Sequence, residues 1–339
     1  MTLLKRLFLI ALFFIVIGAG VLGYGYHYLS QPFGNVHQSE PLVLEFPKGK
    51  HARYVVAQVT QHYSLDKSVL NNTQLSYGFS RLLGGINHLR AGVYEIKPTH
   101  NWFDVWRKLA NGDELQFSVT LVEGHTLEQW LLKLNEATYL TGDAQAAADR
   151  LRAELGASYD SLEGLLLPET YTYRAYSSAE SILRDAYESM QRTLAEVWSE
   201  RSDDCPVDSP YELLVLASII EKETGIAGER SLVASVFANR LAIGMRLQSD
   251  PTTIYGVENF DGNLTRAHLR EKTAYNTYRI NGLPPTPIAM PSRASLEAAA
   301  NPDESPYYYF VADDTGGHVF SKTLEEHNKA VRRYQLKKE

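Results

Sequence analysis

The fold depends on one apolar stretch, residues 209–225, which reads SPYELLVLASIIEKETG. Ser209 is a good N-cap, Pro210 suits the first helical position, and Glu212 completes a capping box. The stretch therefore predicts a helix that begins at Pro210. Its apolar residues cover almost the full circumference, which is typical of a buried helix. Gly225 is a natural C-terminal cap, so the charged residues before it stand at the end of this helix.

Glu221 is a carboxylate at the end of the predicted helix. It lies four residues after Ala217 and projects from the same stripe. Burial disfavours an ionised carboxylate, and so does the negative C-terminal end of the helix dipole. A group that keeps its proton suits general acid catalysis, although an ordinary polar residue at the end of a buried helix gives the same pattern. Glu223 lies about 200° further around the helix, and we expect it to reach solvent or a basic partner such as Arg230.

The N-terminus predicts a membrane anchor. Lys5 and Arg6 precede an apolar run from Leu7 to Tyr26, close to the ~20 residues that cross the hydrocarbon core as a helix. The run is longer than the apolar part of a cleaved signal peptide, and tyrosines at its end suit the membrane interface. We expect residues 1–30 to form a cytoplasmic tip and a single-pass anchor, with the N-terminus in the cytoplasm and the rest exported.

After a short linker at residues 31–40, the region 41–138 alternates strands and helices. Period-two apolar residues predict the strands and 3.6-spaced ones the helices, with Thr99 and Thr126 as N-caps. Trp102 and Trp106 give the second unit a weak likeness to a LysM-type glycan-binding module, but a plain helix core explains them better. The expected strand–helix pairs are 42–46 with 52–61, 92–96 with 102–110, and 117–122 with 127–134.

The remainder, residues 139–339, predicts a larger domain of mixed α and β structure, so the chain is expected to be α+β. Its first part is mostly helical but is interrupted by a compact segment, 162–171, with Glu163 and Glu169 beside Gly and Pro. The net charge of -7 gives no support for a nucleic-acid partner. The single cysteine, Cys205, has no Cys/His cluster around it, and no metal-binding or phosphate-binding motif is present, so we expect no metal and no cofactor.

An ordered set of motifs surrounds the buried helix. Together these motifs resemble the endolytic murein transglycosylase family, also called YceG-like or MltG, over most of the chain. The motifs are 217-ASIIEKET, 233-VASVFANRL, 244-GMRLQSDPT, 274-AYNTY, 282-GLPP and 309-YFVA, followed by Gly317-His318 and His327-Asn328.

The resemblance implies a peptidoglycan lytic transglycosylase, a lyase with Glu221 at the position of the family's essential glutamate. One glutamate would protonate the glycosidic oxygen between MurNAc and GlcNAc and then deprotonate the C6 hydroxyl, leaving a 1,6-anhydro-MurNAc end. The resemblance further implies cleavage within nascent strands, which limits their elongation, beside penicillin-binding proteins and other peptidoglycan synthases. It also implies a single-pass protein of the cell inner membrane with its catalytic domain in the periplasm.

Candidate substrate contacts come from the polar and aromatic residues of these motifs. Glu169 is included because it stands where the family usually has Asp. Turn chemistry explains the same Asp-Pro and Pro-Pro sequences. The candidates are Glu169, Gln248, Asp250, Thr252, Tyr255, Tyr275, Asn276 and Thr277.

Two other functions remain open from the sequence. A peptidoglycan hydrolase (muramidase) would use Glu221 with a second carboxylate such as Asp250 or Glu169 and would release reducing ends. A non-catalytic anchor would bind cell wall through the LysM-like region and release nothing.

Overall fold

A computed structural model describes residues 3–34, 40–65, 73–86, 88–156 and 159–335. Part of the expected linker, residues 35–39, lies outside the described residues. The chain divides into two compact units, and the division passes through the strand pair β3–β4. Unit 1 comprises Met1–Phe117 and Thr172–Ser177, and unit 2 comprises Ser118–Tyr171 and Ser178–Glu339.

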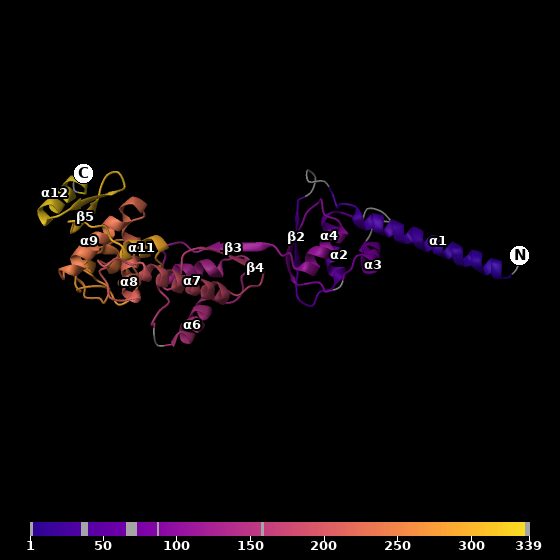
Figure 1. The fold of residues 1–339 in the computed structure, drawn as a ribbon, viewed down its shortest axis with the longest axis horizontal. Helices are drawn as coiled ribbons and strands as arrows, with labels where there is room; N and C mark the ends of the chain where they lie inside the picture. Colours follow the sequence, from indigo (N-terminus) through magenta and orange to yellow (C-terminus); the bar gives the residue numbers. More distant parts are fainter. Residues whose placement is uncertain (1–2, 35–39, 66–72, 87, 157–158, 336–339) are drawn as a thin grey trace. The chain divides into compact units, whose positions relative to one another are not determined.

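Unit 1 contains the N-terminal helix and a small α+β core (Figure 1). Strands β1 and β2 pair antiparallel, with Leu42 opposite Ile96 and Phe46 opposite Gly92. The strands and the helices that follow them match the predicted pairs within one residue. The elements are α1 (Leu3–Ser30), β1 (Leu42–Phe46), α2 (Ala52–His62), α3 (Thr73–Leu83), β2 (Gly92–Ile96) and α4 (Trp102–Asn111).

Trp102 and Trp106 form the centre of this core. They stack with ring centroids 5.8 Å apart and are only 2% and 1% exposed. The Trp106 indole N–H donates to Ser80 Oγ at 3.0 Å. Both rings therefore have no face free for a sugar, as the core interpretation of these residues predicts. Asn101, rather than Thr99, caps α4.

Helix α1 is, among the described residues, the one helix long and apolar enough to cross a membrane. Its C-terminal end packs into unit 1, because Gly25 and Leu29 are buried there. A Cβ at Gly25 would lie only 2.4 Å from the Phe79 ring of α3, so glycine permits this close approach. The end of the apolar helix is thus a part of the unit 1 core.

Unit 2 is mostly helical, with short strands (Figure 1). β3 pairs with β4, a strand from much later in the chain, and β5 pairs antiparallel with β6. The elements are β3 (Gln116–Thr120), α5 (Leu127–Asn135), α6 (Ala144–Glu154), β4 (Thr170–Arg174), α7 (Ala179–Ser199), α8 (Pro210–Glu223), α9 (Arg230–Ala242), α10 (Asp250–Tyr255), α11 (Arg293–Ala300), β5 (Tyr309–Ala312), β6 (His318–Ser321) and α12 (Leu324–Tyr334), with single 3₁₀ turns at Ala227–Glu229 and His268–Arg270.

The division between the units falls at residue 117/118, whereas the sequence suggests a change after residue 138. The helix of the third strand–helix pair, α5, lies in unit 2, where it packs against α6, whereas β3 is divided between the two units. Thr126 caps α5 as predicted, in a full capping box with Gln129.

Helix α8 begins at Pro210 as predicted, but the predicted capping box does not form, because the Glu212 side chain accepts from Asp208 rather than from the N–H of Ser209. Ser209 accepts a hydrogen bond from the Glu212 N–H at 3.2 Å, while the Glu212 side chain bonds to the N–H of Asp208. All residues from Leu213 to Ile220 are buried. The helix ends at Glu223 with Thr224 in an extended conformation, so Gly225 does not provide the cap.

The segment 162–171 begins with a buried loop, residues 162–167, whose apolar side chains enter the core of unit 2, and it ends in β4. Gly164 has φ +75°, in the left-handed region that favours glycine. A Cβ at this position would lie 2.3 Å from the Pro287 Cβ. Gly164 therefore fixes the conformation of its neighbour Glu163, whose side chain is buried.

We predict that Gly164→Ala is much more destabilising than Gly282→Ala. Both glycines have positive φ, but a Cβ at Gly282 would meet no atom within 4 Å. Gly282→Ala should cost about 1–2 kcal/mol from backbone strain, and Gly164→Ala a further ~1–3 kcal/mol from overpacking. Urea unfolding of the detergent-solubilised full chain measures both. Equal losses of unfolding free energy would contradict the close packing at Pro287.

Candidate active site

The end of α8 places three consecutive side chains in different surroundings. Glu221 bonds to the start of α11, Lys222 faces one cavity, and Glu223 faces another. Because the helix is buried around its circumference, each side chain after Ile220 emerges among different packed elements. The two glutamates are therefore chemically distinct although only one residue separates them.

Glu221 is held by hydrogen bonds at the N-terminus of α11. Its Oε2 accepts from the Ser292 N–H at 2.9 Å, from Ser292 Oγ at 2.5 Å and from Ser295 Oγ at 2.6 Å. These hydrogen bonds join α8 to α11, which gives Glu221 a clear structural task.

Glu223 lies in the wall of a cavity of about 430 Å³. Its Oε1 accepts a hydrogen bond from Ser249 Oγ at 2.5 Å. Its pKa is raised from 4.5 to about 7, mainly by burial and also by the nearby Asp250 charge, whereas the Ser249 hydrogen bond, His318 and Arg240 oppose the rise. Glu223 is partly exposed in this cavity, as the expectation of solvent contact allows, but its hydrogen-bond partner is Ser249 rather than Arg230.

Asp250 and Tyr278 line the same cavity. The Tyr278 hydroxyl donates to Asp250 Oδ1 at 2.7 Å. Burial and this carboxylate raise the pKa of Tyr278, so it remains a hydrogen-bond donor. Gln248 also lines the cavity, in a backbone conformation with φ +51°. Of the eight residues predicted to contact substrate, Gln248 and Asp250 thus lie beside Glu223.

Arg240 and Tyr309 complete the polar wall. Arg240 donates to the carbonyls of Tyr308 and Leu247 and lies 5.4 Å from the centre of the Tyr309 ring. Residues of β6 and α12 also line this cavity. Among them, His318 bonds through Nδ1 to Glu229 at 2.8 Å. His318 is the first residue of β6. The other histidine of the wall, His327, stacks on Tyr309 with ring centroids 5.2 Å apart.

Thr252, Asn276 and Thr277 do not reach a cavity surface, because all three are fully buried. Thr252 Oγ1 and Thr277 Oγ1 lie 2.7 Å apart, and Thr277 Oγ1 accepts from the Ser249 N–H at 2.9 Å. The Asn276 amide donates to two backbone carbonyls. The predicted direct contact of these residues with substrate is wrong. Thr252 and Thr277 hold the loop that positions Ser249 against Glu223, whereas Asn276 holds the segment of His268 and Glu271.

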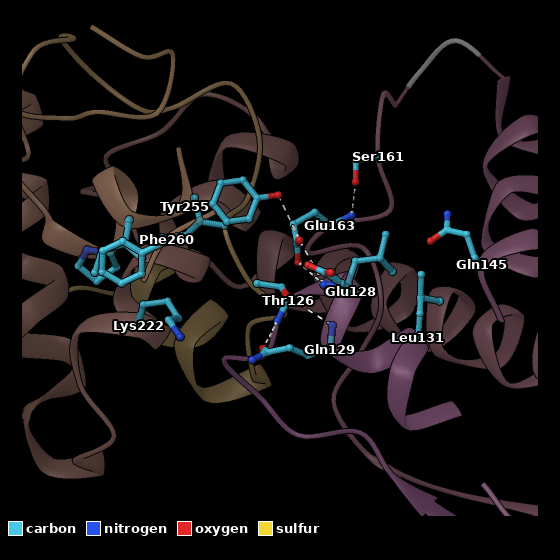
Figure 2. Close-up of a pocket in the computed structure, with 14 residues that line it drawn as sticks. Thr126, Glu128, Gln129, Leu131, Gln145, Ser161, Glu163, Lys222, Tyr255 and Phe260 are labelled. Atoms are coloured by element: carbon cyan, nitrogen blue, oxygen red, sulfur yellow. Dashed lines mark hydrogen bonds between the residues drawn. The ribbon is translucent and has the colours of Figure 1, made fainter. Parts of the chain in front are cut away.

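The remaining candidates lie elsewhere. Tyr255 lines a second cavity, where its hydroxyl donates to Glu163 Oε2 at 3.1 Å (Figure 2). The Tyr275 ring packs against the Tyr255 ring with centroids 4.9 Å apart. Glu169 is exposed, and its backbone carbonyl accepts from the Leu121 N–H beside the β3–β4 pair. Its side chain lines neither of these two cavities.

Glu163 lines the second cavity, although Glu169 and not Glu163 is among the predicted substrate contacts. It is 4% exposed, and burial raises its pKa from 4.5 to about 7, against hydrogen bonds from Leu127 N–H and Tyr255. A signal was present: a lone carboxylate within the apolar run 162–167 is expected to be buried.

Comparison with known proteins gives one consistent family. The YceG-like family model matches residues 44–333. The endolytic murein transglycosylase of Bacillus subtilis (strain 168) is 32% identical over 269 residues, 74% of each chain. The enzyme of that name from Streptococcus pneumoniae (strain D39) is 30% identical over 306 residues, which are 79% of this chain and 55% of the relative. This chain therefore spans about half the length of the streptococcal relative.

A solved structure supports the same assignment. The crystal structure of a YceG-like protein from Listeria monocytogenes matches with a TM-score of 0.52 and 30% sequence identity, over 86% of this chain and 99% of that one. The family model and a relative above 30% identity also cover most of this chain. The chain belongs to the YceG-like family.

Proposed function

We propose that this protein is a lytic transglycosylase that cleaves the MurNAc–GlcNAc β-1,4 bond within peptidoglycan strands and leaves a 1,6-anhydro-MurNAc end. The observation that carries the proposal is Glu223, a carboxylic acid with a pKa of about 7 in the wall of a polar cavity. The names of the relatives support the reaction class, since they are endolytic murein transglycosylases.

The reaction needs one group that acts first as an acid and then as a base. Protonated Glu223 gives its proton to the glycosidic oxygen as the C1–O bond breaks. The carboxylate then takes the proton of the C6 hydroxyl while that oxygen bonds to C1, so no water is consumed. A pKa near the working pH suits both steps. The charge of Asp250, on the same cavity wall, would stabilise positive charge that develops at C1.

The sequence assigns the acid to Glu221, and that assignment stays a prediction. The geometry favours Glu223 instead. Three donors hold Glu221 Oε2 at the start of α11, whereas Glu223 shares a cavity with Gln248 and Asp250. A general acid must reach the leaving oxygen, and the residue in the cavity wall is better placed to do so.

A hydrolase remains the second candidate, and Asp250 is the observation that favours it. Asp250 and Glu223 line one cavity, and two carboxylates are what a hydrolytic glycosidase uses. The products distinguish the reactions: an anhydro end is one water lighter than a reducing end. A non-catalytic wall-binding anchor would yield neither product.

The proposal extends to the cellular setting. Helix α1 would anchor the protein in the cell inner membrane, and Lys5 and Arg6 before the apolar run would keep the N-terminus in the cytoplasm. Unit 1, with its LysM-like region, and unit 2 would then lie in the periplasm. There the enzyme would limit the elongation of nascent strands beside peptidoglycan synthases such as penicillin-binding proteins.

We predict that Glu223→Gln lowers the rate of strand cleavage by about 10²–10⁴-fold, because glutamine cannot transfer the proton. Glu221→Gln should keep most of the rate but lose about 1–2 kcal/mol of stability, since an uncharged oxygen accepts weaker hydrogen bonds from Ser292 and Ser295. The measurement is mass spectrometry of glycan strands digested by each purified full-length variant.

The paired variants control for each other, because both replace a carboxylate on α8 by its isosteric amide. An inactive Glu221→Gln protein that is fully folded, with an active Glu223→Gln protein, would return the acid to Glu221. Reducing ends in place of anhydro ends would reject the transglycosylase and favour the hydrolase.

We predict that the stability gained by Glu223→Gln grows with pH. In wild type the folded pKa of Glu223, about 7, lies above its ordinary value of 4.5. Its stabilising contribution is complete below pH 4.5 and is lost as pH rises to about 7, a change of about 3 kcal/mol. Unfolding free energies of both proteins at several pH values measure the difference. A difference independent of pH would mean that Glu223 is not a shifted acid.

A further inference from the structure

A second cavity, of about 820 Å³, lies in unit 2 on the side of Lys222 (Figure 2). Its size is in the range of pockets that bind small ligands. Figure 2 shows Phe260 and Lys222 at one end and Gln145 and Leu131 at the other, with Glu163 between them. We call this space the Glu163 cavity. Tyr255 is a predicted substrate contact that lines it.

A buried glutamate such as Glu163 is unusual in a cavity wall that has only a structural role. Both carboxylate oxygens lie within 3.2 Å of the Leu127 N–H at the start of α5, and Tyr255 donates to Oε2. A glutamine oxygen would accept the same backbone bond without the cost of burying an ionisable group. A buried acid that lines a concave cavity is instead typical of a functional site.

The cavity wall combines an aromatic ring, aliphatic side chains and polar groups, among them the charged residue types Glu128, Glu163 and Lys222. Phe260 offers a ring face, and Leu131, Ile254 and Ile288 offer apolar surface. The Gln129 Oε1 accepts from the Thr126 N–H, whereas its Nε2 donates to no residue in the described part of the chain. N-acetylhexosamines match this mixture, since they present an apolar ring face, an acetamido methyl group and several hydroxyls.

The Glu163 cavity and the Glu223 cavity have neighbouring residues in their walls. At the end of α8, Lys222 lines the Glu163 cavity and the next residue, Glu223, lines the Glu223 cavity. At the start of α10, Pro251 lines the Glu163 cavity and Asp250 lines the Glu223 cavity. Two pairs of adjacent residues, one on each helix, therefore lie between the cavities. A polymer cut at Glu223 would continue past this boundary into the Glu163 cavity.

We propose that the Glu163 cavity is a glycan-binding site that holds N-acetylhexosamine residues of the strand on one side of the bond cut at Glu223. The proposal rests on the proposed function and deepens it. Binding a strand beyond the reacting sugar favours cleavage within chains over cleavage of short fragments. Phe260 and the amides of Gln129 and Gln145 contact the sugars, and Glu163 accepts or donates a hydrogen bond from the cavity floor.

The test compares long glycan strands, freed of stem peptides by an amidase, with a tetrasaccharide prepared from the same strands. The variants Phe260→Ala and Gln145→Ala in the full-length protein should each lower kcat/KM for long strands about five- to tenfold relative to the tetrasaccharide. The loss should appear in KM more than in kcat. Helices α5 and α6 both line the cavity, and Leu132→Ala on α5 and Arg152→Ala on α6, which are exposed outside it, should keep the wild-type ratio.

Binding without turnover separates this proposal from the proposed function. In the Glu223→Gln background, Phe260→Ala should weaken binding of long strands about five- to tenfold by calorimetry, whether or not the wild type produces anhydro ends. Unchanged binding and an unchanged ratio of long to short substrate in both cavity variants would overturn the glycan site. Failure of cleavage by every protein, with binding lost only in the cavity variants, would overturn the proposed reaction alone.

Discussion

Helix α8 is apolar around its whole circumference, and the rest of unit 2 depends on its burial. α7, α9, α10 and α11 pack against it, so its sides are closed to solvent and ligands. Polar chemistry is therefore confined to its C-terminal end. The last residues there emerge among different neighbours, which gives Glu221 a structural environment and Glu223 a cavity.

Unit 2 maintains two carboxylic acids, Glu163 and Glu223, with pKa values near 7. A buried carboxyl group with a raised pKa lowers the stability of the fold as the pH rises, and unit 2 contains two such groups. Each acid has fixed hydrogen-bond partners, Leu127 and Tyr255 for the first and Ser249 for the second. These partners orient the acids without supplying a full countercharge, so both remain close to their titration point at neutral pH.

Local sequence signals predicted most of the secondary structure. Strands β1 and β2 have the expected bounds, because alternating apolar residues and flanking turns specify a short strand locally. The caps at Ser209 and Thr126 follow from hydrogen bonds within four residues. The β3–β4 pairing was not predictable in this way, since its partners lie about fifty residues apart and no local pattern encodes that register.

The sequence by itself determined the family, the apolar N-terminal helix and the buried α8 with a charged end, because motif order, composition and periodicity are properties of the chain. Only the tertiary structure decided which polar residues face a cavity. Thr252 lies in the same motif as Gln248 and Asp250, which line a cavity, yet it is buried, as are Asn276 and Thr277. Glu163 likewise lies in a cavity wall, whereas Glu169 lines neither cavity. The physical reason is that the surroundings of a side chain depend on elements distant in sequence. The start of α11 supplies the hydrogen-bond partners of Glu221, and the loop that contains Ser249 supplies that of Glu223.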